Sequence, residues 1–183
     1  MTVSDQQDFD AGGSAEPEGL LPQFQTFSGQ AEFVSLVRSC VVSACEQGAV
    51  NLVFCDTDFS NWPLDDEAII AALQGWANST SNQRMLVMVA ATYGFIEQNH
   101  GAWVRWRKIW DHRVQCWQLN AQADPNLPGV FWSRQNMVVV HDRERCTGMM
   151  SREGQRIIRE KGRLDEFIRQ SDPAFPASTL GLW

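Results

Sequence analysis

Two short, nearly continuous apolar runs constrain the fold of this chain more than any other feature. They are AVNLVFCD at residues 49–56 and RMLVMVAAT at residues 84–92. Uninterrupted apolar runs of this length are typical of strands that are buried on both faces of a sheet. The chain must therefore cover these strands with helices on two sides.

Helical periodicity surrounds both runs, and further strands follow them. Helices are expected from Ser28 or Gly29 to Gly48, from Asp65 or Asp66 onward, over 93–111 with a break near Gly101, and over 151–170. HRVQCWQL, FW, QNMVVVH and CTGMM read as strands, the last two around a tight DRER turn. This order predicts an α/β domain of three layers, α/β/α, with a mixed, mostly parallel sheet and an antiparallel hairpin at one end.

Charge and composition divide the chain into three parts. Residues 1–37 hold six acids and no base, whereas the rest is nearly neutral. We expect a disordered acidic tail over 1–19, a single α/β domain over 20–172, and an extended apolar tail over 173–183. That C-terminal tail is too apolar to stay in water, so it should lie along a groove of its own domain or of a second copy, as a homodimer.

The same composition limits the expected partners and location. A near-neutral body argues against general nucleic-acid binding, which depends on a basic field. No apolar window is long enough for a membrane span, and the first residues do not form a signal peptide. The five cysteines have no metal-like spacing, so free thiols in the cytoplasm are expected.

The stretch HGAWVRWRKIWDH, residues 100–112, combines tryptophans with basic side chains. At helical spacing its tryptophans share one narrow stripe, Trp103, Trp106 and Trp110, and the basic side chains lie roughly opposite, Arg105, Lys108 and His112. We expect the tryptophans to pack in the core. The basic side is either a solvated face or an anion-binding face.

FCDTDFSNW, residues 54–62, places Asp56 and Asp58 at the carboxyl end of a predicted strand, where α/β proteins form ligand sites. An apolar strand that ends in Asp-x-Asp resembles the nucleophile loop of haloacid dehalogenase-like phosphatases, which use Mg²⁺. The other motifs of that machinery are absent from the sequence. Turn capping by these carboxylates is therefore the preferred interpretation.

A third candidate is QNMVVVHDRERCTGMM, in which His141 stands next to Asp142. The pair could act as a general base with an orienting carboxylate across the turn. Adjacent residues of a strand point to opposite faces, however, so a polar hairpin turn is the preferred interpretation.

Several segments resemble a family of uncharacterised proteobacterial proteins: FCDTDFSNWPL, the H-x11-H helix, VVVHDRERCTG and DPAFPASTLGL. This likeness covers most of residues 24 to 182. The order of elements also resembles one half of a phospholipase D-like fold. In that superfamily a hairpin carries H-x-K-x4-D, with histidine as nucleophile, lysine on the phosphate and aspartate as support. Placing Asp142 on that aspartate puts Gln135 and Met137 at the histidine and lysine positions.

The resemblance implies a scaffold that lacks phosphodiesterase chemistry. We therefore predict a phospholipase D-like half domain without catalytic residues, metal or cofactor, which acts as a binding or interaction module for an unknown protein or a small anionic ligand. The residues expected to bind that ligand are Asp56, Asp58, Arg105, Lys108, His112, His141 and Asp142. The alternative is a Mg²⁺-dependent phosphoryl-transfer enzyme that uses Asp56 and Asp58.

Overall fold

The computed structural model describes residues 21–79, 83–121 and 127–176. The acidic segment expected over 1–19 lies outside these residues, as does the end of the chain from 177 to 183. The strands are β1 (Phe24–Ser28), β2 (Asn51–Asp56), β3 (Met85–Ala90), β4 (Val114–Leu119), β5 (Gly129–Ser133), β6 (Met137–Asp142), β7 (Thr147–Ser151) and β8 (Ser171–Pro173). The helices are α1 (Gln30–Glu46), α2 (Glu67–Ala77), α3 (Gly94–Asn99), α4 (Gly101–Ile109) and α5 (Gly154–Arg169), with a short 3₁₀ turn at Asp111–Arg113.

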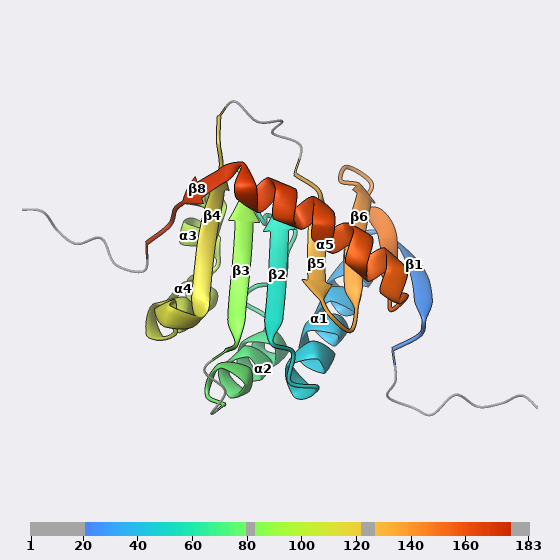
Figure 1. The fold of residues 1–183 in the computed structure, drawn as a ribbon, viewed down its shortest axis with the longest axis horizontal. Coiled ribbons are helices and arrows are strands. Elements are labelled where there is room, and N and C mark those ends of the chain that lie inside the picture. The colour runs from blue at the N-terminus through green and yellow to red at the C-terminus, as the bar shows by residue number, and fades with distance from the viewer. Residues whose placement is uncertain (1–20, 80–82, 122–126, 177–183) are drawn as a thin grey trace, which may run out of the picture.

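All of these strands join one mixed sheet in the order β1-β7-β6-β5-β2-β3-β4-β8 (Figure 1). The expected α/β class is confirmed. Parallel pairing is confined to β2, β3 and β4, and the other pairs in the described ranges are antiparallel. The expectation that the sheet is mostly parallel is therefore wrong outside its centre. Short turns join β5 to β6 and β6 to β7, and such turns can only link antiparallel neighbours.

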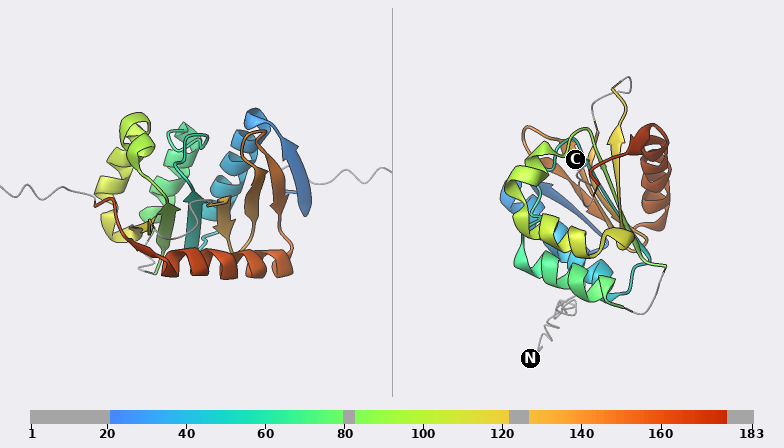
Figure 2. Two further views of the ribbon diagram at one scale, coloured as in Figure 1. Left: turned by 90° about the horizontal axis from the view of Figure 1, so that it is seen from above. Right: turned by 90° about the vertical axis from the view of Figure 1, so that its left-hand side faces the viewer.

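Helices cover the two faces of the sheet unequally (Figure 2). Helices α1 to α4 lie on one face, whereas α5 crosses the other face diagonally. The predicted break near Gly101 is confirmed, because His100 leaves helical geometry with φ −112° and ψ 59° between α3 and α4. No helix of the described residues is both long enough and apolar enough to span a membrane.

Two aspartates bind the N-termini of helices on the sheet face that α1 to α4 cover. Asp66 caps α2 through the backbone N–H groups of Ala68 and Ile69. The neighbouring Asp65 accepts hydrogen bonds from the N–H groups of Ala102 and Trp103 at the start of α4. Carboxylates at helix N-termini satisfy donors that the helix itself leaves open.

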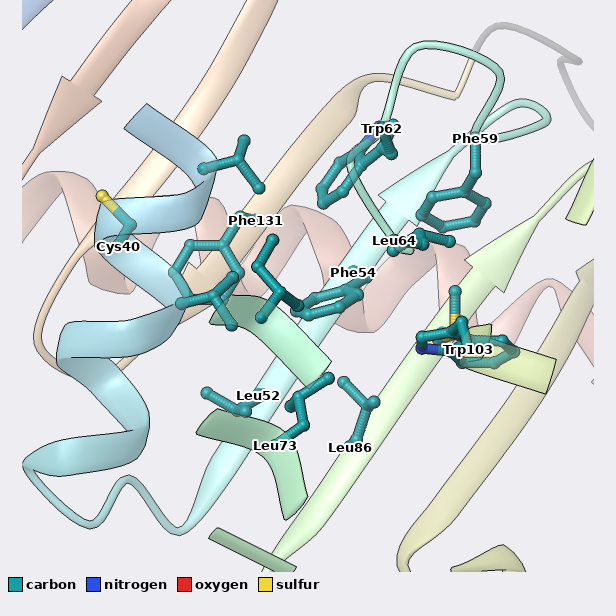
Figure 3. Close-up of a cluster of buried hydrophobic side chains, with 14 of the residues drawn as sticks. Cys40, Leu52, Phe54, Phe59, Trp62, Leu64, Leu73, Leu86, Trp103 and Phe131 are labelled. Carbon is teal, nitrogen blue, oxygen red and sulfur yellow. The ribbon is translucent and has the colours of Figure 1, made fainter. Parts of the chain in front are cut away.

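The main core lies between the sheet and helices α1 to α4. Figure 3 shows its aromatic centre, where Phe54 of β2 packs against Phe131 of β5 and against Trp62. The loop that follows β2 closes the carboxyl end of this core, because Phe59 and Trp62 fold back over it with their rings 5.2 Å apart. Core packing thus fixes the end of β2, with Asp56, and the following loop, with Asp58.

The described start of the C-terminal segment packs on the same chain. Strand β8 pairs antiparallel with β4, and the half-buried Phe175 packs against the core. The described part of this segment, up to residue 176, therefore lies against its own domain.

Candidate ligand-binding cleft

A cleft of about 380 Å³ opens at the edge of the sheet where β2 and β6 end. We call it the β2–β6 cleft. Its lining combines aliphatic side chains of β6 with polar and basic groups: Thr57, Leu127, Pro128, Gly129, Val139, Val140, His141, Arg143 and Arg163. The carboxyl ends of β2, β3 and β6 point to the same edge in Figure 1.

Asp56, the last residue of β2, lies beside this cleft and is almost fully buried, with 5% of its surface exposed. One carboxylate oxygen accepts from Nη1 of Arg143 at 2.7 Å and from the backbone N–H groups of Asp58 and Phe59, both at 3.1 Å. The other accepts from the indole N–H of Trp62 at 3.1 Å. The buried charge is thus compensated by an ion pair and three further hydrogen bonds, as a buried carboxylate requires.

Asp58 completes a fork around the same guanidinium group. It accepts from Nη2 of Arg143 and, at 2.9 Å, from the backbone N–H of Ser60. Partial burial raises the pKa of Asp58, but the hydrogen bonds from Ser60 and the charge of Arg143 outweigh it, so the pKa lies below its ordinary value. Asp58 is therefore an ionised partner of Arg143 at neutral pH.

This geometry suits an ion pair better than a magnesium site. The guanidinium of Arg143 stands at the position between Asp56 and Asp58 that a shared cation would need. Within the described residues, no group of three or more histidine, cysteine or acidic side chains is arranged to hold a metal ion. Mg²⁺ favours open oxygen ligands, whereas the oxygens of Asp56 already face N–H donors.

Helix α5 contributes the second cation of the cleft. Nη1 of Arg163 lies 3.1 and 3.0 Å from the two carboxylate oxygens of Glu160, one turn earlier. Glu160 is only 6% exposed, so it holds the guanidinium group of Arg163 beside the cleft from a buried position. Two guanidinium groups from different elements thus border one cavity.

Sequence reasoning missed both arginines. The sequence predicts Arg143 only as part of a polar turn, and the partners of its side chain lie 85 and 87 residues earlier. The Glu160–Arg163 spacing is an ordinary helical pair, which alone predicts no cleft.

His141 and Asp142 take separate positions. His141 is exposed and lines the β2–β6 cleft. Asp142 accepts a hydrogen bond from the backbone N–H of Arg145 at 3.0 Å and closes the turn after β6. This turn role is the preferred sequence interpretation for Asp142.

The basic side of α4 lies elsewhere. Arg105, Lys108 and His112 are exposed, and α4 covers the sheet face opposite α5 (Figure 2). The structure therefore does not bring them to the β2–β6 cleft. Trp103 and Trp106 are buried as expected.

Trp110 departs from the expected buried stripe. Trp110 is half-buried and lies just after the last residue of α4, outside the helical geometry that defines the stripe. Its indole N–H donates to Gln74 at 3.0 Å.

The positions that correspond to the phospholipase D motif are spread along β6. Gln135 lies in the turn before this strand, and Met137 is buried at its first residue. Asp142 lies at the other end, roughly 16 Å from Met137 at the usual rise of about 3.3 Å per residue. Neither Gln135 nor Met137 supplies the nucleophile or the cation of that motif.

Comparison with known proteins shows the fold. No family model and no curated protein matches the chain. TrmBL2, an archaeal chromatin protein described as having a novel mode of DNA binding, matches with a TM-score of 0.62 and 10% identity, over 88% of this chain and 57% of that one. A polyphosphate kinase from Porphyromonas gingivalis matches with a TM-score of 0.56 and 9% identity, over 83% of this chain and 27% of that one.

NucT from Helicobacter pylori also matches, with a TM-score of 0.50 and 9% identity, over 82% of this chain and 98% of that one. At such identities the likeness extends to the fold alone, and this fold is phospholipase D-like. The chain spans little more than half of the length of TrmBL2. The resemblance to a proteobacterial family remains a prediction.

The comparisons correct one expectation. The near-neutral body argues against general nucleic-acid binding, but TrmBL2, which is described as binding DNA, shares the fold. The exclusion is wrong because net charge averages over the whole chain. A net charge does not show that the guanidinium groups of Arg143 and Arg163 border one cavity.

Proposed function

We propose that this chain is a non-catalytic, phospholipase D-like binding module that holds a phosphodiester group in the β2–β6 cleft. The main observation behind this proposal is that Asp56 and Asp58 hold the guanidinium group of Arg143 in place. Arg163 borders the same cavity. Planar guanidinium groups suit phosphate oxygens, and each offers five N–H donors. The contacts to the carboxylates leave several of these donors free for a ligand.

The charge around the cleft favours a phosphodiester over a more highly charged ligand. The two arginines are outnumbered by three carboxylates, Asp56, Asp58 and Glu160, so these five groups carry one net negative charge. The carboxylates direct the N–H donors of the arginines but leave no excess positive charge. A phosphodiester carries only one negative charge and several acceptor oxygens, so this group repels it less than it would repel a polyphosphate.

Two further observations support the proposal. TrmBL2 has this fold and binds DNA, so DNA is the first polymer to test. Gln135 and Met137 occupy the positions where the phospholipase D motif has its nucleophile and its phosphate-binding lysine. These residues support binding without hydrolysis.

Arg143→Gln and Arg163→Gln are each expected to weaken binding of a labelled oligonucleotide by about 10- to 100-fold, because a charged hydrogen bond contributes about 1.5–3 kcal/mol. Fluorescence anisotropy with single-stranded and double-stranded DNA at two salt concentrations measures this. Arg145→Gln is the matched control, since its side chain is 83% exposed in the same turn. Unchanged affinity in folded Arg143→Gln protein contradicts the proposed site.

No cleavage of a phosphodiester substrate is expected with or without Mg²⁺. Incubation with a chromogenic diester and with labelled DNA, followed by product analysis, tests this expectation. Metal-dependent turnover that Asp56→Asn abolishes would support the phosphoryl-transfer alternative instead.

A further inference from the structure

A second feature lies away from the β2–β6 cleft, where the chain passes β4 after strand β8. The ring of Phe175 stacks on Tyr93, with centroids 4.9 Å apart and planes 10° from parallel. Trp103 is also nearly parallel to it, at 6.3 Å and 11°. We call the position that the Phe175 ring occupies beside Tyr93, Trp103 and Arg107 the Phe175 slot.

This stacking differs from the other aromatic packing of the protein. In the described ranges, the ring pairs without Phe175 are tilted or edge-on. Such geometries are common in protein cores. Parallel aromatic walls suit a flat ring, as in the recognition of unstacked nucleobases.

Arg107 gives the slot a cationic, hydrogen-bonding wall. Its guanidinium carbon lies 4.6 Å from the centroid of the Phe175 ring, and the guanidinium also donates to the carbonyl oxygen of Phe175. Nε of Arg107 donates to Sγ of Cys116 at 3.3 Å, which fixes the side chain although it is almost fully buried. An aromatic wall together with an arginine is the combination that proteins use to stack bases.

Two indole N–H donors near the slot have no acceptor. The indole N–H of Trp103, a wall residue, is buried without an acceptor. The same holds for Trp106, whose ring lies 6.4 Å from that of Trp103. Buried donors without acceptors are rare in folded proteins. The phenylalanine ring has no acceptor atom, whereas a nucleobase carries several on its edge.

Phe175 is held in the slot at a conformational cost. Ala174 donates its N–H to the carbonyl of Cys116 at 2.9 Å, but Phe175 itself adopts φ +51°, the left-handed region. A bulky residue in that region is strained. The segment is thus anchored by β8, while Phe175 itself adopts a strained backbone conformation.

We infer that the Phe175 slot is a binding site for a nucleobase, and that Phe175 of the same chain fills it in this structure. The inference is independent of the phosphodiester proposal, because the walls, the donors and the ring that fills the slot lie outside the β2–β6 cleft. A base enters when Phe175 leaves, so the observed affinity is reduced by the fraction of molecules in which the slot is filled.

Isothermal titration calorimetry of the full chain with adenosine and cytidine tests this inference, since nucleosides carry no phosphate. Phe175→Ala is expected to bind at least about tenfold more tightly than the unmodified protein, as base stacking can supply that difference. Adding Tyr93→Leu should remove the gain. Phe24→Ala is the matched control, because Phe24 is an exposed aromatic at the opposite edge of the sheet.

The outcomes separate a base site from ordinary packing. Circular dichroism establishes that each variant is folded, and Phe175→Leu replaces Phe175→Ala if the alanine variant is not. Folded variants that bind nucleosides no better than the unmodified protein overturn the inference. Indole that binds as tightly as adenosine would also overturn it, since the slot would then select a flat ring without reading acceptors. A third outcome is that Phe175→Ala gains nucleoside binding while Arg143→Gln leaves the affinity for DNA unchanged. That result supports the Phe175 slot and rejects only the β2–β6 cleft as a phosphodiester site.

Discussion

Trp106→Ala is expected to lower the free energy of unfolding by about 3–5 kcal/mol, the usual cost of truncating a buried large aromatic side chain. Trp106 is 3% exposed and packs with Trp103 between α4 and the sheet. Alanine would leave a cavity there, because α4 is tied at its start by Asp65 and cannot collapse freely. Urea denaturation followed by circular dichroism measures the loss.

The matched controls lie on the opposite side of the same helix. Arg105→Ala and Lys108→Ala should each change stability by less than about 0.5 kcal/mol, because both side chains are exposed. Equal losses in the basic and the tryptophan variants would show that the faces of α4 have been assigned the wrong way round.

Asp56→Ala is expected to destabilise the protein by about 3–5 kcal/mol, as is usual when one partner of a buried ion pair is removed. The substitution leaves the Trp62 indole N–H and two backbone N–H groups without their acceptor. It also leaves Arg143 with one carboxylate in place of two. Thermal and urea melts measure the effect directly.

Asp58→Ala separates burial from charge in this experiment. Its side chain is 34% exposed and pairs with the same guanidinium, so the loss should be about 0–1 kcal/mol, as for a surface ion pair. If both variants lose the same stability, the buried hydrogen bonds of Asp56 do not contribute as proposed.

The centre of the fold could be predicted from the sequence, since local signals and burial agree there. The runs around Phe54 and Met88 are apolar at every position that faces a helix layer, and both became parallel central strands. The break before Gly101 was also readable, because a glycine interrupts the helical pattern. These features depend on residues close together in the chain.

The edges of the sheet could not be predicted in the same way. Strand β1 buries only Phe27 and β8 only Ser171, so neither carries a periodic apolar pattern. Their extended geometry comes from pairing with β7 and β4, which are far away in the sequence. Tertiary context determines such strands, because strand propensity alone is weak.

The candidate site shows the same limit. The sequence pointed to Asp56 and Asp58 at a strand end, and the structure places them there. Their partner Arg143 follows from the insertion of β5 between β2 and β6, which sets the distance between the two loops. No local sequence pattern indicates that strand order, so the pairing of Arg143 with Asp56 and Asp58 could not be predicted.

The position of β5 also affects how the chain is made. β2 pairs on one side with β3 and on the other with β5, which is translated about 70 residues after β2 ends. At about 5–20 residues per second, one edge of this apolar strand stays unpaired on the nascent chain for roughly 4–15 s. An open apolar edge is a template for association with other chains. Association through the open edge of β2 is therefore expected to be most favourable before β5 has emerged.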